Sequence, residues 1–316
     1  MIALAVVLYF ADVEKLRQAI LLANGRLLLL AVGLVFAWLG VRALLWRTLL
    51  QEKARYRDVF WTMNEGYLLN NVLPFRLGEV ARAFLLSRKA PVGFWEVLST
   101  IILERILDLT MAVGLLFTTL PFVVGGSNQF PIAFGVLVVV FIALFVLYLI
   151  ARNRDWTINV INKITHRIPW VQRVTGKVLP AFMDGLAVLT DGRRFLKAVS
   201  LVILDWIIAI LQYHVIILAF VPVAKLLWSS FTLAVTALGI AAPSSPGALG
   251  VLEAAVVGSL AVFGVDASAA LAAAIFAHLL QYLVTGVLGV YALVIDGESL
   301  AGLYRRVRNL QSKPQG

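Results

Sequence analysis

The chain contains no cysteine among its 316 residues, and charged side chains make up only 14% of it. Without thiols it has no disulfide, no cysteine nucleophile and no cysteine-ligated metal, and the redox compartment stays open. Soluble domains carry about 25% charged and about 45–50% apolar residues, whereas 61% of this chain is hydrophobic. A water-soluble fold of this length would expose larger apolar patches than monomers tolerate. The composition therefore predicts an integral membrane protein with a single membrane domain.

Signatures of nucleotide and hydrolytic chemistry are missing as well. The sequence has no G-x-x-x-x-G-K-[ST] loop, no H-E-x-x-H pair and no G-x-S-x-G elbow. No polar segment is large enough for a nucleotide-binding domain, and no basic-aromatic module stands apart from the apolar runs. We expect no catalytic residue, no metal, no cofactor and no nucleic-acid partner.

Long apolar runs are what the sequence does contain. A membrane helix needs about 20 such residues, and residues 1–10 supply half of that, so we expect them to be the end of a span whose first part is missing. Runs of full length cover residues 26–50, 92–122, 132–150, 195–221 and 269–295. Together these predict six transmembrane helices.

Two further apolar runs, residues 60–87 and 226–262, are interrupted near their centres. Proline breaks the helical hydrogen-bond ladder there, and broken backbone at membrane depth survives only inside protein or beside a watery cavity. Each run is therefore expected to form a re-entrant helical hairpin. The expected tips hold Pro74 and Gly78 in the first hairpin, and Pro243, Pro246, Gly247 and Gly250 in the second.

The net charge of +10 is concentrated in a few segments. Basic residues gather between residues 47 and 57, between 152 and 197, and in the tail at 296–316, whereas residues 125–129 and 221–225 hold one charge. Cytoplasmic loops are the ones enriched in Lys and Arg. We therefore expect a bacterial or archaeal cytoplasmic (inner) membrane protein with both termini in the cytoplasm.

The two halves of the chain resemble each other. Residues 24–35 and 191–202 are identical at seven of twelve positions, the P-x-x-L-G motif at 74–78 recurs at 246–250, and Arg105 with Asp108 corresponds to His278 with Gln281. The charge pattern predicts that residues 26–50 run toward the cytoplasm and that residues 195–221 run away from it. We expect two repeats of inverted topology, residues 1–124 and 130–295, as in secondary transporters whose broken helices hold the substrate at the midplane.

Polar side chains inside the apolar runs are costly, about 2.5–3.5 kcal/mol each at the bilayer centre on insertion scales, so they normally pair or line a polar path. Arg76 and Arg105 are expected to hold an anionic headgroup, because guanidinium forks suit phosphate. Glu79 and Asp108 are expected either to orient these arginines or to act only as structural clamps. Arg42 and Arg82 lie nearer helix ends, where long side chains can reach the membrane interface.

In the second half, Ser244 and Ser245 lie beside the prolines of the hairpin tip, where free backbone groups favour an anion. A simple helix break filled by neighbouring side chains is the alternative. Glu253 and His278 could carry protons if transport is proton-coupled, although a single histidine in an apolar helix is more often just hydrogen-bonded.

Three segments carry a family resemblance: N-V-L-P-F-R-L-G-E-V-A-R at 71–82, L-E-R-I-L-D at 103–108 and P-S-S-P-G-A-L-G-V-L-E at 243–253. The chain resembles the flippase-like membrane family named for the transmembrane region of lysylphosphatidylglycerol synthase. The resemblance implies movement of polar or glycosylated lipids between leaflets, without the soluble aminoacyltransferase domain of bifunctional members. It also implies that the family motif falls on Asn71, Pro74, Arg76, Gly78, Glu79, Arg82, Glu104, Arg105, Asp108, Pro246, Gly247, Gly250 and Glu253.

The sequence thus predicts a lipid translocase whose partners are membrane lipids, with an anionic or glycosylated headgroup in a central polar cavity. Two alternatives stay open: a non-transporting partner that presents lipid to a separate synthase or glycosyltransferase, and a membrane-embedded transferase. The candidate substrate-binding residues are Asn71, Arg76, Glu79, Arg82, Glu104, Arg105, Asp108, Ser244, Ser245, Glu253, His278 and Gln281.

Cysteine labelling tests the predicted topology, because the chain has no native thiol. Single cysteines at Ser127 and Val223 should react with an impermeant maleimide added outside, since the predicted external segments carry almost no basic charge. A cysteine at Asn162 should stay unlabelled. Labelling at Asn162 with none at Ser127 would reverse the topology.

Overall fold

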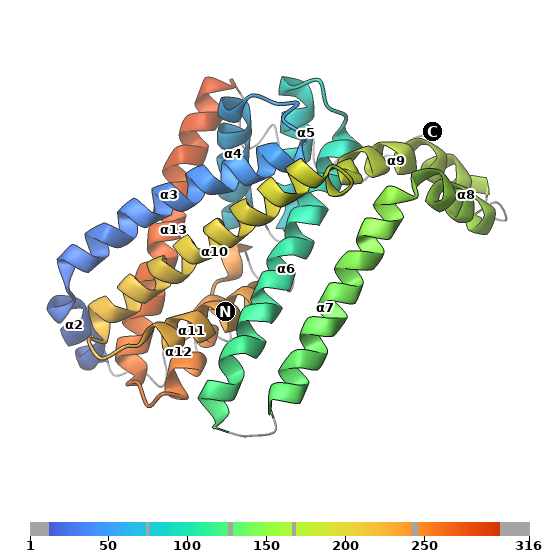
Figure 1. The fold of residues 1–316 in the computed structure, drawn as a ribbon. Coiled ribbons are helices and arrows are strands. Elements are labelled where there is room, and N and C mark those ends of the chain that lie inside the picture. Colours follow the sequence, from blue (N-terminus) through green and yellow to red (C-terminus); the bar gives the residue numbers. More distant parts are fainter. Residues whose placement is uncertain (1–12, 74–75, 126–128, 166–168, 242–245, 298–316) are drawn as a thin grey trace.

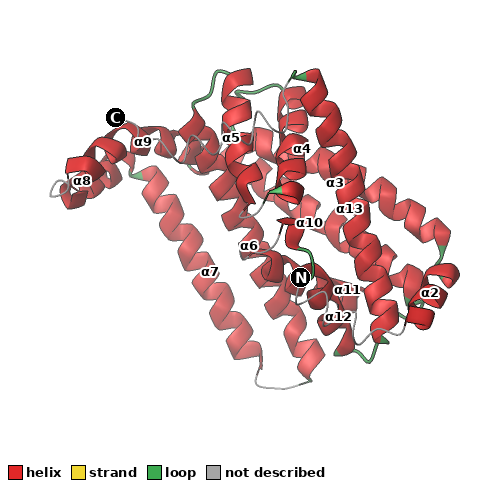
Figure 2. Ribbon diagram, turned by 180° about the vertical axis from the view of Figure 1, so that it is seen from behind, coloured by secondary structure: helices red, strands yellow, loops and turns green. Residues whose placement is uncertain are grey.

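The computed structural model describes residues 13–73, 76–125, 129–165, 169–241 and 246–297. Regular structure in these ranges is entirely helical (Figures 1 and 2), and no strand occurs in them. The α-helices are α2 (Val13–Leu22), α3 (Gly25–Leu49), α4 (Tyr56–Val72), α5 (Leu77–Lys89), α6 (Phe94–Val124), α7 (Gln129–Arg152), α8 (Arg154–Thr165), α9 (Pro169–Leu186), α10 (Gly192–Phe220), α11 (Leu226–Ala241), α12 (Val251–Ala261) and α13 (Ala267–Ile295). Two short 3-10 helices are η2 (Ala187–Leu189) and η3 (Pro246–Ala248).

Among the described residues, four helices are long and apolar enough to cross a membrane: α3, α6, α10 and α13. Each covers one of the runs that the sequence predicted as a span, within three residues at either end. The predicted span at 132–150 lies inside α7, a single helix of 24 residues. Residues 1–10, the expected end of a further span, lie outside the described residues.

Both interrupted runs are broken helices. In the first run α4 ends at Val72 and α5 begins at Leu77, and in the second α11 ends at Ala241 and α12 begins at Val251. The two helices of each run pack against each other. The break predicted from sequence is therefore present in both runs, although Pro74, Pro243, Ser244 and Ser245 lie outside the described residues.

The two broken pairs enter the bundle from opposite ends (Figures 1 and 2). The α4–α5 pair lies at the end where α8 and α9 extend to the side, and the α11–α12 pair lies at the end where α6 connects to α7. The pairs meet inside the bundle, because α4 contacts η3. The Arg76 guanidinium also donates a hydrogen bond to the carbonyl of Ile240 near the end of α11.

Each broken pair crosses at a glycine. A Cβ on Gly66 would lie 3.1 Å from the Cβ of Arg82, and one on Gly239 would lie 3.6 Å from the Cβ of Ala255. The glycines and their partners are separated by the same offset of 173 residues between the two halves. Arg76 and Ala248 hold the same place in the P-x-x-L-G motif, and both adopt left-handed backbone, with φ of 55° and 59°.

Helices α3 and α10 pack side by side in opposite directions (Figure 1). Their N-caps are Asn24 and Asp191, whose side chains accept backbone hydrogen bonds at the start of each helix, as N-caps do. The backbone N–H of Asn24 donates to the carbonyl of Ala219 at the end of α10 (3.0 Å). At the opposite end Lys197 pairs with Glu52, and its hydrogen bond and charge lower the pKa of that carboxyl.

Gly78 supplies a test of the first helix pair. Its amide donates to the Oδ1 of Asn70 (2.9 Å), and an added Cβ would lie 2.1 Å from the carbonyl oxygen of Gly66. Gly78→Ala should lower the free energy of unfolding by about 1–3 kcal/mol, the usual cost of overpacking, measured by thermal unfolding in detergent. The control is Gly258→Ala in α12, where an added Cβ meets nothing within 4 Å. Equal stabilities of the two variants would contradict this close packing.

Candidate functional site

A buried cluster of charged side chains joins α3, α5, α6 and α10. At its centre Arg42 of α3 donates two hydrogen bonds to Asp108 of α6 and one, of 3.0 Å, to Asp205 of α10. A third carboxylate, Glu104, lies 2.8 Å from the same guanidinium. Arg42 is 4% exposed, and a guanidinium keeps its proton in proteins. Three carboxylates therefore converge on one permanent cation.

Glu104 links this centre to the first helix pair. It is fully buried, and its other oxygen pairs with Arg82 of α5 at 2.5 Å. The Arg82 guanidinium lies 3.6 Å from the ring centre of Trp46, a cation–π contact, and the Trp46 Nε1 donates to the Thr100 hydroxyl at 3.1 Å. The charge of Arg82 is thus held by a buried carboxylate and by a buried aromatic ring.

Arg105 and Arg76 extend the cluster toward the N-terminal end of α5. Arg105 lies 3.1 Å from Glu79, 3.3 Å from Asp108 and 3.6 Å from Glu104. Arg76 lies 3.6 Å from Glu79. Both arginine side chains keep 28–30% of their surface exposed. They form the accessible end of the cluster, whereas Arg42 and Arg82 form its buried end.

The charges of the cluster balance. Four arginines face four carboxylates, so the cluster is neutral when all eight groups are ionised. Removing one partner from such a buried set leaves an uncompensated charge. Within the described ranges, no group of three or more His, Cys, Asp or Glu side chains could hold a metal ion. The members are Arg42, Arg76, Glu79, Arg82, Glu104, Arg105, Asp108 and Asp205.

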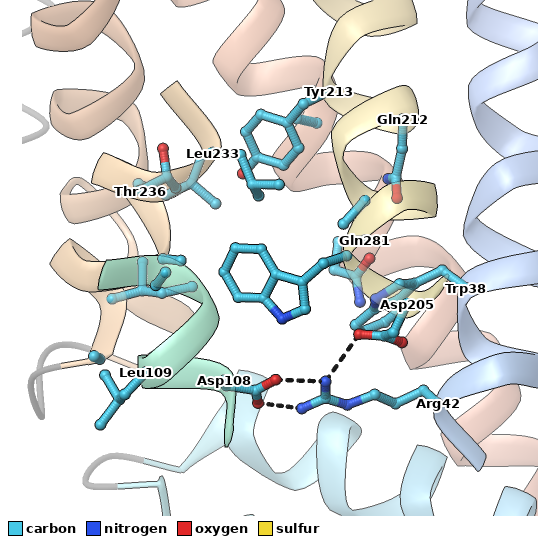
Figure 3. A pocket seen from close by; sticks show the side chains of 18 of the residues that line it. Trp38, Arg42, Asp108, Leu109, Asp205, Gln212, Tyr213, Leu233, Thr236 and Gln281 are labelled. Carbon is cyan, nitrogen blue, oxygen red and sulfur yellow. Dashed lines mark hydrogen bonds and ion pairs between the residues drawn. The ribbon is translucent and has the colours of Figure 1, made fainter. Parts of the chain in front are cut away.

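A cavity of about 470 Å³ opens beside this cluster. Both halves of the chain contribute to its wall, from α3, α4, Arg76 before α5, and α6 on one side and from α10, α11, α12 and α13 on the other. Figure 3 shows Asp108, Arg42 and Asp205 linked at one side of it, with Tyr213, Thr236 and Leu233 lying away from these charges. The cavity therefore has a charged end and a largely uncharged wall. Its size falls within the usual range for ligand sites.

A second polar group lies at the α11–α12 pair. The Nδ1 of His278 lies 2.6 Å from Glu253 Oε1, and its Nε2 lies 2.9 Å from the carbonyl oxygen of Gly247. The other oxygen of Glu253 accepts from the amide of Gly250 at 2.7 Å. Because a carbonyl only accepts, Nε2 must carry a proton, and a second proton lies between Nδ1 and the carboxylate. The pair thus shares one proton and fixes both sides of the turn before α12.

The structure brings together most of the candidate residues. Gln281 lines the cavity with Arg76, Arg105 and Asp108. Asn71 donates to the Thr285 hydroxyl at 3.1 Å and so links α4 to α13. Glu253 and His278 form a separate pair beside Gly247. Ser244 and Ser245 are outside the described residues.

Arg42 and Arg82 do not reach the membrane interface, and that expectation is wrong. Both side chains are almost fully buried in ion pairs. Position along a helix suggested an exposed end, but the carboxylates of α6 and α10 draw both side chains inward. Asp205 is the other member that the candidate site omitted. The sequence did indicate Asp205, because a single carboxylate within a membrane-spanning run requires a cation as partner.

Arg42→Ala tests the buried centre. It removes the shared partner of Asp108 and Asp205, so the free energy of unfolding should fall by about 3–5 kcal/mol. Arg26→Ala at the exposed start of the same helix should change it by no more than about 0.5 kcal/mol. Thermal unfolding of both variants in one detergent measures the difference. An Arg42→Ala protein as stable as Arg26→Ala would show that the cluster contributes nothing to the fold.

The chain is similar to several archaeal membrane proteins. A UPF0104 membrane protein of Methanocaldococcus jannaschii is 28% identical over 253 residues, covering 78% of this chain and 97% of the relative. A second one from that organism is 23% identical, covering 92% and 90%. One from Methanothermobacter thermautotrophicus is 22% identical, covering 95% and 94%. No solved structure matches the chain. The family described as "Lysylphosphatidylglycerol synthase TM region" matches residues 1–289, so this chain is a membrane protein that belongs to that family.

Proposed function

We propose that this protein moves polar lipids between the two leaflets of its membrane. The cavity between the halves of the chain is the observation that carries the proposal, because its charged end can take a headgroup. Acyl or prenyl chains would stay in the bilayer while the headgroup crosses. Membership of a family named for a lipid-modifying enzyme supports a lipid as the ligand.

The proposal includes two repeats of inverted topology, each with a re-entrant hairpin. Three observations support it: the opposite entry of the broken pairs (Figure 1), the shared offset of their glycine crossings, and the matching left-handed residues Arg76 and Ala248. In transporters built this way, the substrate site lies between the repeats, and one repeat moves against the other. The lining of the cavity by residues of both halves supports this arrangement.

Within the cavity, Arg76 and Arg105 are the proposed phosphate ligands. Their side chains are the accessible arginines of the cluster, and a guanidinium binds phosphate through two parallel hydrogen bonds. Arg76 has one carboxylate neighbour, at 3.6 Å, whereas Arg105 has three. Arg76 would therefore lose less by turning to a headgroup, and Arg105 would act from a fixed position. In this proposal the carboxylates orient the arginines and do not act as catalysts.

Reconstitution in liposomes tests transport directly. The protein would be inserted into vesicles that contain a lipid with a fluorescent acyl chain, and a membrane-impermeant quencher added outside would report the lipid that has crossed. Protein-dependent crossing is expected. Bound lipid with no crossing would favour the presenting role, and a covalently altered lipid would favour a transferase.

Arg76→Lys separates binding by shape from binding by charge. Lysine keeps the positive charge but lacks the bidentate fork, so the variant should fold normally and translocate an anionic lipid about tenfold more slowly. Arg88→Lys at the far end of α5 serves as the control. If Arg76→Lys translocates lipid at the rate of the unaltered protein, Arg76 is not a phosphate ligand. Thermal unfolding of the same samples shows whether a slower rate reflects only a less stable fold.

A further inference from the structure

The turn before α12 is held by two buried ionisable side chains. His278 of α13 and Glu253 of α12 keep only 7% and 4% of their side-chain surfaces exposed. The histidine ring contacts Glu253 through Nδ1 at 2.6 Å and the carbonyl oxygen of Gly247 through Nε2 at 2.9 Å. The second carboxylate oxygen accepts from the backbone N–H of Gly250 at 2.7 Å. One pair of side chains thus holds both ends of the turn.

The backbone of this turn depends on such contacts. Gly247, Ala248 and Gly250 all adopt left-handed backbone, with φ of 59°, 59° and 84°, a region that residues with a side chain rarely occupy. The carbonyl that His278 binds directly precedes Ala248. Helix α4 contacts η3 here, so the turn also lies where the two helix pairs meet. A change in the histidine contact would therefore act at the junction of the two pairs.

Both contacts of the histidine ring require a proton. A carbonyl oxygen only accepts, so Nε2 must donate, and a proton must also lie between Nδ1 and the carboxylate oxygen. A neutral imidazole carries one N–H, and an ionised carboxyl carries none. The pair therefore holds one proton more than a neutral histidine and an ionised glutamate hold together. Without that proton, either Nδ1 and the carboxylate or Nε2 and the carbonyl would face each other as two acceptors.

No other charge replaces that proton. Among the described residues, His278 is the only cation in an ion pair with Glu253. Helices α11 and α12 contain no further ionisable residue, and α4 contains none between Tyr67 and its end at Val72. The other ionisable neighbours are Tyr282, whose ring packs edge-on against His278 with 4.7 Å between ring centres, and Tyr213 of α10. Loss of the proton would leave a buried carboxylate without a cation, which is costly.

We propose that Glu253 and His278 form a proton-binding site whose occupancy fixes the turn before α12. With the proton bound, the pair is neutral overall and both ring nitrogens donate. When the proton leaves to water, one of the two contacts is lost and the turn is released. Pro246 in the turn is exposed, so the turn is not sealed inside the bundle. The inference needs no lipid in the cavity and stands apart from the proposed function.

Glu253→Gln retains every contact without the extra proton. The amide oxygen can accept from the Gly250 N–H, and the amide nitrogen can donate to Nδ1 of a neutral His278, which still donates to Gly247 through Nε2. His278→Phe removes both contacts instead. Glu52→Gln, in the exposed loop after α3, is the control for removing a carboxylate elsewhere.

Hydrogen–deuterium exchange of the full chain in detergent, read by mass spectrometry on residues 246–253, measures how firmly the turn is held. A range from about pH 5 to about pH 9 spans the titration of histidine, and the rates are corrected for the intrinsic pH dependence of exchange. In the unaltered protein and in Glu52→Gln, protection should fall about tenfold as the pH rises, the effect of losing one hydrogen bond. It should stay high throughout in Glu253→Gln and low throughout in His278→Phe.

Protection that does not change with pH in the unaltered protein would overturn the proposal, and so would a Glu253→Gln protein with the same pH dependence. If that variant does not fold, nitrogen-15 NMR of the histidine ring decides. His166→Gln with His214→Gln leaves His278 as the only histidine. Its ring should carry two protons at low pH and one at high pH, and an unchanging number contradicts the site. Lipid translocation can fail while this pH response persists, so the two proposals are tested separately.

Discussion

The structure depends on one constraint: a guanidinium buried away from water stays charged. Arg42 lies in the middle of an apolar bundle, and the free energy of leaving it unpaired there would exceed what a marginally stable fold can tolerate. Helix α6 brings two carboxylates to it and α10 brings a third, from residues far apart in the sequence. These ion pairs connect α3 to α6 and α10, and the cavity lies beside them.

The same constraint explains how the two helix pairs differ. In the first pair the glycine crossing at Gly66 meets Arg82, which carries a charge into the bundle and must be matched by Glu104. In the second pair the equivalent crossing meets Ala255, and the polar contacts there are milder: a histidine and a carboxylate that share a proton. The charges are thus concentrated in the first helix pair.

Sequence reasoning predicted the helices well because their signals are local. Apolar length gave α3, α6, α10 and α13, and the prolines and glycines gave the two breaks. The partner of each charge could not be predicted in the same way. Glu79 lies three residues before Arg82 on the same helix, but Arg82 pairs with Glu104 of another helix. Such pairings depend on which helix faces compete for a cation, and only the packed structure settles that.

The left-handed backbone of Arg76 has an energetic consequence for motion. A residue other than glycine in that conformation costs about 1–2 kcal/mol, and strain of this kind persists only where surrounding contacts enforce it. One such contact joins the two helix pairs, since the Arg76 side chain donates a hydrogen bond to the carbonyl of Ile240. Separating the pairs at this point would break that hydrogen bond and would also free Arg76 to leave its strained conformation. The free energy of separation at this point is therefore smaller than the hydrogen bond alone implies.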